Sequence, residues 1–406
     1  MKAFLIDSYR HENTISLWVQ QDGKNKRLRF PFTPRIYVEK NEDSAFLTAY
    51  PVEKRMTYLE EELEVYCLEV PLHRYEKTVR WIELTSNYRA HIFNADIPPE
   101  QEFLYAHDLT PCTWIDLDTL TPLIEKKKRL KAARIELETL HDLRKFPGTP
   151  LRSLRLNGEG YFGHERAVLE KFIELFTRED PDILILDYSH RVLPFLIQKC
   201  EQYGIDFTFH RFDPVPIRYR GGKSFFSYGR VSFKDFPVRL HGRLLVDSTA
   251  VVAQECDDVG IMELCELSGS RFQTVASRSF GSVFQGALLR EMYKRNYLIP
   301  FKQKPVDQPL SLQELIKADR VGLVMDPEVG LHRNVAEIDF SSMFPHIIYE
   351  HNVSAETIIR PKGKRRQVPG LSLAISHEKR GVVPTAVKPL IDRRMQHKQE
   401  DSTSRI

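Results

Sequence analysis

An acidic residue followed by small hydroxyl groups is the first feature of this sequence that could do chemistry. The stretch EIDFSSMFPHIIYEHN, residues 337 to 352, places Asp339 after an apolar run and then continues with two serines, an aromatic residue and a proline. The apolar run predicts a strand, with Asp339 at its C-terminal tip and a sharp turn into a helix after it. A carboxylate in that place can present oxygen atoms to a divalent cation and its phosphate ligands. The pattern suits phosphoryl or nucleotidyl transfer, although strand-ending aspartates are usually structural turn residues.

Two cations further along the chain could bind the phosphates of the same substrate. The stretch LIDRRMQHK contains Arg394 and Lys398, which are four residues apart. On a helix this spacing places both side chains on one face, where they can bind a single triphosphate. The same spacing also fits a solvated basic helix face.

Length and composition predict a soluble globular protein with two to four domains. The chain has 406 residues, of which 42% are hydrophobic and 28% are charged. Its five cysteines show no metal-ligand spacing and no disulfide pattern, which favours a reducing, cytoplasmic location. The N-terminus resembles a strand more than a signal peptide, and no window has the roughly 18 apolar residues of a membrane span. We therefore expect no targeting signal and no membrane association.

The basic residues are concentrated at the C-terminal end of the sequence. The formal net charge is only +3, but residues 360–406 contain twelve Lys and Arg against four Asp and Glu. Such a segment suits a polyanion such as DNA, or a triphosphate, although it also fits a solvated basic loop. The candidate DNA-binding residues are those of the densest run, RPKGKRR: Arg360, Lys362, Lys364, Arg365 and Arg366.

Hydrophobic patterns predict the elements that position these residues. Short runs rich in β-branched and aromatic residues, such as AFLIDSYR, TISLWVQQ and KRLRFPF, predict an antiparallel meander at the start of the chain. Alternating strands and helices follow, including the helix ERAVLEKFIELFTRE and the strand PDILILDY, which predicts an α/β unit. The stretch EKKKRLKAARIELETLHDL has the periodicity of a helix. A helical region comes next, and RVGLVMDPEVGLHRNVAEIDF predicts two strands that flank a turn.

The stretch DFSSMFPHIIYEHNVSAETI resembles motif A of the family B DNA polymerases, D-x-x-S-L-Y-P-S-I-I followed by H-N-V-S-x-x-T. The resemblance implies that Asp339 is one of two palm aspartates that hold a catalytic Mg²⁺ pair. It implies that the backbone groups of Ser342 and Met343 face the incoming triphosphate. It also implies that Phe344 lies under the sugar and excludes a 2′-hydroxyl, at a position where the family usually has Tyr.

The resemblance extends along nearly the whole chain, in the order of the family, and implies an archaeal type of polymerase. RFPFTPRIYV is similar to a strand of the family's N-terminal domain. ASRSFGSVFQGALLREMYKRNYLIP is similar to the helix that leads into the palm, and LIDRRMQHK is similar to the first helix of the fingers. The implied fold is a multidomain α+β protein. It comprises a β-rich N-terminal domain at 1–130, an RNase H-like exonuclease-type domain at 131–262, a partial palm at 263–388 and the start of the fingers at 389–406. DRVG, residues 319–322, departs from the family's Y-x-G-G loop.

The exonuclease-type domain lacks part of the family's carboxylate set. IELETL resembles the first exonuclease motif, with Glu136 replacing an aspartate and Glu138 retained, so the resemblance implies a strand where periodicity predicts a helix. Asp187 and Asp247 end two later strands, but Val192 occupies the position of a metal-binding aspartate, and the third motif is missing. Because such a nuclease needs about four carboxylates around two metals, we expect proofreading to be abolished.

Two polymerase motifs do not occur in these 406 residues: K-x-x-x-N-S-x-Y-G of the fingers, and Y-x-D-T-D, which supplies the second palm aspartate. We therefore expect the chain alone not to polymerise. It could be the N-terminal half of a split enzyme, a truncated form, or a protein that has lost catalysis.

We favour one of the first two explanations, with template-directed DNA synthesis by the completed enzyme. The implied partners are primer-template DNA, deoxynucleoside triphosphates (dNTPs), a separate C-terminal polymerase chain and a sliding clamp. The degenerate exonuclease motifs favour a specialised role, such as repair, over bulk replication.

Two alternatives come from other functional classes. In the first, the chain is a non-catalytic DNA-binding or scaffolding subunit derived from a polymerase. In the second, which we consider weaker, it is a nuclease built on Glu136, Glu138, Asp187 and Asp247.

Overall fold

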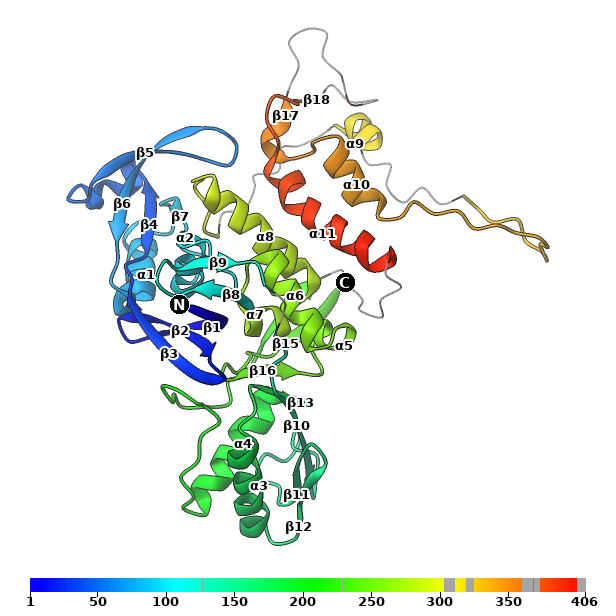
Figure 1. Ribbon diagram of the computed structural model, residues 1–406. Helices are drawn as coiled ribbons and strands as arrows, with labels where there is room; N and C mark the ends of the chain where they lie inside the picture. The colour runs from blue at the N-terminus through cyan, green and yellow to red at the C-terminus, as the bar shows by residue number, and fades with distance from the viewer. Residues whose placement is uncertain are drawn as a thin grey trace.

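The computed structural model has a mixed α+β fold, as the sequence predicts. The structure describes residues 1–125, 128–227, 229–302, 311–318, 325–359, 368 and 373–399. Figure 1 shows two β-rich layers from the N-terminal part, an α/β unit beside them, and a group of helices that carries the last described residues.

The first sheet is the predicted antiparallel meander, extended by a later hairpin. Its strand order is β3-β2-β1-β8-β9. The turn between β2 and β3 contains only Asp22 and Gly23, with φ angles of 51° and 74°, as a two-residue hairpin turn requires. The strands are β1 (Lys2–His11), β2 (Thr14–Gln21), β3 (Lys24–Pro31), β8 (Thr113–Asp116) and β9 (Thr121–Leu123).

A second sheet follows, with the order β5-β6-β4-β7. Helix α1 packs on it through Val79 and Ile82, whereas helix α2 packs on the first sheet through Phe103 and Leu104. The elements are β4 (Arg35–Glu39), β5 (Val52–Met56), β6 (Glu62–Glu69), β7 (Ile92–Phe93), α1 (Tyr75–Thr85) and α2 (Pro99–Ala106), with short 3₁₀ helices at Glu42–Leu47 and Leu72–Arg74.

The α/β unit has a five-stranded sheet with the order β12-β11-β10-β13-β16, in which β10, β13 and β16 are parallel. Residues of α3 and α4, among them Phe172 and Leu193, form its hydrophobic core. The elements are β10 (Ala132–Thr139), β11 (Leu151–Leu156), β12 (Glu159–Phe162), β13 (Ile183–Leu186), β16 (Leu244–Asp247), α3 (Glu165–Glu179) and α4 (Ser189–Gln202). Because parallel strands end at one edge, Asp187 and Asp247 lie at the same side of this sheet.

The helix that periodicity predicts for residues 125–143 is wrong, because residues 132–139 form strand β10. Ala133 and Ile135 are buried while Arg134 and Glu136 are exposed, which is the alternation of a strand. Pairing with β11 on one side and β13 on the other outweighs the helical propensity of this lysine- and leucine-rich stretch. The strand implied by the family resemblance is the one that forms.

The helical part of the chain is built around α8. This helix packs against α6 and α11, and α11 packs against α10. The helices are α5 (Val251–Glu255), α6 (Asp258–Ser268), α7 (Phe272–Ala276), α8 (Phe280–Lys294), α9 (Leu312–Ala318), α10 (Met343–Glu350) and α11 (Val382–Gln399), with a 3₁₀ turn at Ala355–Thr357. Two small hairpins are β14 (Lys223–Ser227) with β15 (Arg230–Lys234), and β17 (Ile358–Ile359) with β18 (Ala374–Ile375).

Strand β1 joins two hydrophobic cores because both of its faces are buried. Ala3 and Leu5 belong to the core of the first sheet. Phe4 and Ile6, on the opposite face, belong to a core that also contains residues of β13, β16, α6 and α8. This second core crosses the boundaries expected at residues 130 and 262, and those boundaries remain a prediction.

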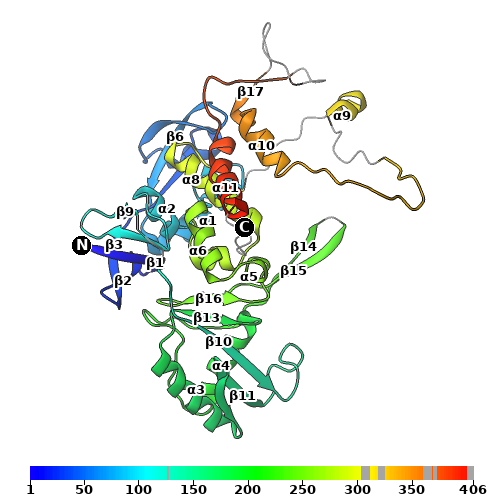
Figure 2. The same cartoon turned by 45° about the vertical axis from the view of Figure 1, so that its right-hand side comes forward.

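Two strands are expected within residues 320–340; the first falls mainly outside the described residues, and the second is a correction. Residues 319–324 lie outside the described residues, and residues 325–340 form no strand. Figure 1 and Figure 2 show the latter as an extended segment that projects away from the body of the molecule. Val335, Ile338 and Phe340 are 75%, 92% and 74% exposed. A strand needs a hydrogen-bonded neighbour, and the described part of the chain supplies none to this apolar run.

No helix within the described ranges combines the length and the apolar character needed to cross a lipid bilayer.

Candidate functional site

The chain turns sharply between the extended segment and helix α10. Ser342 precedes α10 with φ of 52° and ψ of 45°, a left-handed conformation that redirects the backbone. The first helical residues, Met343 and Phe344, are 40% and 58% exposed. The turn into a helix after Asp339 is therefore as predicted, whereas the strand before it is not.

Helices α10 and α11 form a hollow of about 370 Å³ together with α6 and α8. Ser342 and Phe344 line it from α10, and Arg394 lines it from α11, while the remaining lining is apolar. One turn beyond Arg394, the ammonium of Lys398 donates a hydrogen bond to Ser341 Oγ at 2.6 Å. The structure thus brings together the residues expected to bind the nucleotide, from segments about fifty residues apart. Asp339 does not line this hollow.

A buried asparagine holds α11 in place against α10. Asn352 is 1% exposed and has a φ of 58°. Its Nδ2 donates to the carbonyl oxygens of Ser376 and Lys379, both at 2.8 Å, and its Oδ1 accepts from the Gly381 N–H at 2.8 Å. These bonds fix the loop that enters α11. The H-N-V-S part of the motif therefore works here as a clamp between two helices.

The same loop is packed too closely for a side chain at residue 381. A Cβ on Gly381 would lie 2.5 Å from the Cβ of Ser354, and a real Cβ contact is never so short. Ser354 Oγ also accepts a hydrogen bond from the Val383 N–H at 3.2 Å. The close packing of this loop thus depends on the small residues Ser354 and Gly381.

An anchor for α11 that sequence reasoning missed is Glu263 of α6. Its carboxylate is 3% exposed. It pairs with Arg393, and both of its oxygens lie 3.1 Å from Nε2 of His397. Because Arg393 and His397 are four residues apart, their pairing with Glu263 sets the rotation of the helix that carries Arg394 and Lys398. No local sequence signal marks Glu263, since it lies about 130 residues before its partners.

Asp339 has an exposed carboxylate in the extended segment. Within the part of the chain that the structure describes, no three His, Cys, Asp or Glu side chains gather to form a metal site. A single carboxylate does not make a two-metal site, so the described residues do not fit a Mg²⁺ pair by themselves.

The four exonuclease-type carboxylates are divided among different surroundings. Glu136 and Asp187 line a hollow of about 390 Å³, together with Arg144, Tyr188 and Arg191. Glu138 instead accepts a hydrogen bond from Ser153 Oγ at 3.2 Å. In this hollow the guanidinium of Arg144 lies 5.5 Å from the centre of the Tyr188 ring and forms an ion pair with Asp142 at 2.9 Å.

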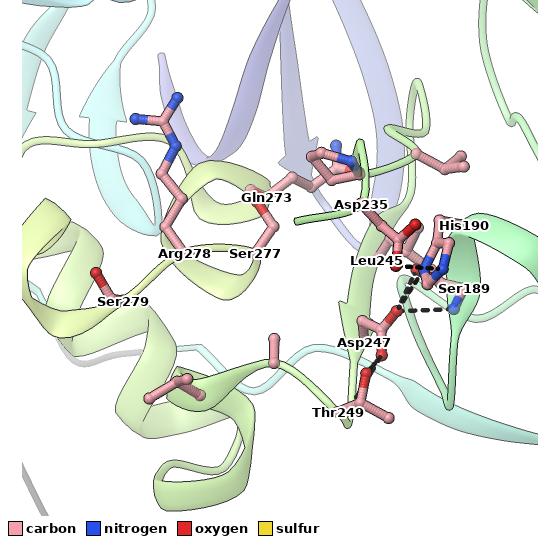
Figure 3. Close-up of a pocket in the computed structure, with 14 residues that line it drawn as sticks. Ser189, His190, Asp235, Leu245, Asp247, Thr249, Gln273, Ser277, Arg278 and Ser279 are labelled. Atoms are coloured by element: carbon pink, nitrogen blue, oxygen red, sulfur yellow. Dashed lines mark hydrogen bonds and ion pairs between the residues drawn. The ribbon is translucent and has the colours of Figure 1, made fainter. Parts of the chain in front are cut away.

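Asp247 is held by hydrogen bonds at the start of α4 (Figure 3). Its Oδ2 accepts from Ser189 N at 2.7 Å and from Ser189 Oγ at 2.8 Å, and its Oδ1 accepts from Thr249 Oγ1 at 2.6 Å. Burial raises the pKa of Asp247, but the bonds from His190, Thr249 and Ser189 outweigh burial and hold the pKa well below its usual range. These bonds use the lone pairs that a metal would need. Asp247 lines a different hollow from Glu136, of about 350 Å³.

Val192, at the position where the family carries a metal-binding aspartate, is 7% exposed and packs in the core of the α/β unit. The five candidate DNA-binding residues of the basic run lie outside the described residues: Arg360, Lys362, Lys364, Arg365 and Arg366.

Comparisons with known proteins find the same family that the sequence motifs resemble. The sequence profile described as DNA polymerase family B matches residues 272–404. DNA polymerase 1 of Pyrococcus abyssi is 22% identical over 420 residues, which cover 87% of this chain and 51% of that protein. The DNA polymerase of Pyrococcus horikoshii is 22% identical over 468 residues, which cover 99% of this chain and 35% of that protein. The chain is thus similar to archaeal DNA polymerases, and over residues 272–404 to the family B profile.

The fold of the chain is also similar to that of a solved polymerase. The structure of the family B DNA polymerase from the archaeon Pyrobaculum calidifontis matches with a TM-score of 0.67 and 16% identity, covering 98% of this chain and 64% of that one. The chain spans about half, or less, of the length of the Pyrococcus relatives.

Proposed function

We propose that this chain is the N-terminal part of a template-directed DNA polymerase, and that it binds the incoming dNTP between α10 and α11. The observation that carries the proposal is the shared hollow of Ser342, Phe344 and Arg394, with Lys398 held beside it at Ser341. These residues come from two motifs that are separated in sequence; Ser342, Arg394 and Lys398 fit the family's pattern, and Phe344 keeps the ring of the Tyr that is usual there. The relatives in the comparisons are named DNA polymerases.

The proposed roles follow from the chemistry of each side chain. Arg394 and Lys398 bind the triphosphate, because a guanidinium and an ammonium on one helix face can neutralise adjacent phosphate groups. Phe344 presents a 58% exposed ring that can lie under the sugar and leave no room for a 2′-hydroxyl. The backbone groups of Ser342 and Met343 face the phosphates at the start of α10.

Asp339 supplies one carboxylate toward Mg²⁺, and the second palm aspartate comes from polypeptide outside these 406 residues. That polypeptide also supplies the K-x-x-x-N-S-x-Y-G lysine, which this sequence does not contain. It could be a separate C-terminal polymerase chain. We expect the present chain alone to incorporate no nucleotide.

The exonuclease-type unit is proposed to be inactive as a nuclease. Glu136 and Asp187 lie in one hollow and Asp247 in another, and the oxygens of Asp247 are already occupied by hydrogen bonds. Two metal ions need several converging carboxylates to compensate their charge and that of the transition state. Degradation of a labelled single strand by this chain, lost in Glu138→Ala, would contradict this part of the proposal.

Primer extension with Mg²⁺ tests the polymerase proposal. The chain is assayed alone and together with the polypeptide that copurifies with it, on a labelled primer and template. We expect incorporation only in the mixture, and none when the chain carries Asp339→Ala. The matched control is Asp326→Ala, because Asp326 is another exposed aspartate of the same extended segment. Equal loss in both variants would show that the segment, and not the Asp339 carboxylate, is what matters.

The second candidate function is a non-catalytic DNA-binding or scaffolding subunit. The absence of a metal cluster among the described residues favours it. In the same assay this candidate predicts primer-template binding with no incorporation in any mixture.

A further inference from the structure

Helix α1 carries a second apolar face, and this face is exposed to solvent. Val79 and Ile82 are buried against the second sheet. By the spacing of a helix, Trp81 and Leu84 lie on the opposite face, and they are 43% and 50% exposed. The solvent face of a surface helix is normally polar, so two large apolar side chains there are unusual. We call Lys77, Trp81 and Leu84 the outer stripe of α1.

The aromatic side chains at this face are held in place. The ring of Trp81 meets the ring of Phe46 edge-on, with 5.3 Å between the ring centroids, and Phe46 packs against the core beneath α1. Tyr88, which is 66% exposed, follows the helix with a φ of 62°, and its N–H donates to the Glu83 carbonyl oxygen at 2.6 Å. Bulky residues rarely adopt a positive φ, so the turn that closes the helix fixes Tyr88 there. Rigid Trp and Tyr side chains lose little freedom on binding, and they are enriched at the energetic centres of protein interfaces.

The cations around the outer stripe are not neutralised by neighbouring carboxylates. Lys77 and Arg80 are exposed, and neither forms an ion pair within the part of the chain that the structure describes. Both carboxylates of α1 are used by other contacts, because Glu76 and Glu83 each lie 2.7 Å from a cation outside the helix. The surface therefore combines exposed apolar groups with unpaired positive charge. A partner of matching chemistry has apolar side chains and free carboxylates.

The spacing of the outer stripe favours a helix as the partner. Its members are separated by four and then three residues, which is the spacing at which packed helices interlock their side chains. Helix α1 has 11 residues, so it is about 16 Å long, and one partner helix of similar length covers it. A second copy of this chain fits less well, because its outer stripe brings the same unpaired cations and no free carboxylate of α1.

We propose that the outer stripe of α1 binds an acidic amphipathic helix of a partner protein. Trp81 is the central anchor, and Lys77 and Arg80 pair with carboxylates of the partner. A contact between two short helices belongs to the size class of weak, transient interfaces. Figure 1 shows α1 well away from α10 and α11. The proposal does not depend on nucleotide binding, so it can fail while the polymerase proposal stands, and the reverse.

A synthetic peptide serves as the probe for this surface. It consists of about three heptads with Leu at positions a and d and Glu at positions e and g, where repulsion between the Glu side chains opposes self-association. Fluorescence anisotropy of the labelled peptide, titrated with the full chain, gives the affinity. We expect Trp81→Ala to weaken binding at least about tenfold, as removal of a central interface anchor does. The matched control is Phe146→Ala, because Phe146 is a 55% exposed ring of the α/β unit, and its removal should leave the affinity unchanged.

The double variant Lys77→Gln, Arg80→Gln separates charge from apolar contact. We expect about fivefold weaker binding at low salt and no difference from the unaltered chain at about 1 M salt, because salt screens exposed ion pairs. The control Arg152→Gln, Arg155→Gln removes two exposed cations of β11 that also form no ion pair with a described residue. It should leave the affinity unchanged at both salt concentrations.

Tryptophan fluorescence reports on the site itself. Trp81 is the most exposed of the three tryptophans, since Trp18 is 1% exposed and Trp114 is partly buried. Saturation with unlabelled peptide should protect the fluorescence from quenching by acrylamide. Unchanged quenching would place the peptide elsewhere on the molecule and overturn the proposal.

Competition and oligomeric state distinguish the other occupants. A peptide with Ser at every Leu position, and an oligothymidylate of equal negative charge, should both compete weakly with the probe. Equal competition by either one overturns the proposal, as does a Trp81→Ala variant that binds like its control. Sedimentation equilibrium of the chain alone should show no dimer that Trp81→Ala dissociates, because such a dimer would mean that a second copy covers the outer stripe. Thermal unfolding of each variant verifies that it is folded.

Discussion

Replacing Asn352 tests whether the clamp holds α11 in place. Asn352→Gly removes three hydrogen bonds of 2.8 Å, and each contributes about 1 kcal/mol net in a folded protein. The carbonyls of Ser376 and Lys379 and the Gly381 N–H lose their partner. The free energy of local opening of the loop and of the first turns of α11 should therefore fall by about 3 kcal/mol.

The assay is hydrogen–deuterium exchange of peptides that cover residues 373–388. A loss of about 3 kcal/mol makes amides that exchange through this opening exchange about a hundredfold faster. Peptides from the first sheet should be unaffected, because β1 to β3 make no contact with the clamp that the substitution removes.

A matched control is available in the same region. Asn334 has the same φ of 58°, is exposed, and makes no side-chain hydrogen bond with any described residue. Asn334→Gly makes the same change in backbone freedom without removing the clamp. If Asn352→Gly and Asn334→Gly alter exchange equally, the hydrogen bonds are not what holds α11, and the reasoning is refuted.

Two further predictions concern buried carboxylates. Glu263→Gln removes the negative charge that Arg393 and His397 share, and should lower the stability of the α6–α11 contact by about 2 kcal/mol. This value is below the range for a fully buried ion pair because Arg393 is 32% exposed. Hydrogen–deuterium exchange in α11 should become faster, and it should not change in the control Glu255→Gln, whose side chain is exposed. Burial raises the pKa of Glu102 to about 8, so the folded chain keeps a proton that the unfolded chain releases near pH 4. Stability therefore falls as the pH rises from about 5 to 8, and urea unfolding of Glu102→Gln should show a smaller fall; an identical pH dependence would mean that Glu102 ionises normally.

Elements with a strong local pattern could be predicted from the sequence. The helix expected over ERAVLEKFIELFTRE has the same bounds as α3, because Val168, Phe172 and Leu175 recur at helical spacing and all three are buried. The turn at Asp22 and Gly23 has a similarly strong local signal, because Asp and Gly are among the few residue types that adopt positive φ in a two-residue hairpin turn.

Other elements depend on partners that no local pattern reveals. Residues 132–139 contain good helix formers, but two neighbouring strands capture them as β10. Residues 334–340 have the composition of a strand and remain unpaired in the described part of the chain. In both cases the pairing partner decides the outcome, as is general for strands.

The candidate site was predictable in part for the same reason. Ser342, Phe344 and Arg394 could be selected by motif and do meet in one hollow. Glu263 could not, because only the tertiary fold brings it to Arg393 and His397. The role of Asn352 as a clamp also needed the structure, since its partners are three backbone groups that any residue types could supply.

Strand β1 has a consequence for the order of events during synthesis. One of its faces can be covered early, by residues up to about 115, but the other requires β16, α6 and α8, which are made more than two hundred residues later. Contacts of such long sequence separation close late. Phe4 and Ile6 should therefore remain exposed to ribosome-associated chaperones until residues near Val283 have emerged, and nascent chains stopped before that point should be the most prone to aggregate.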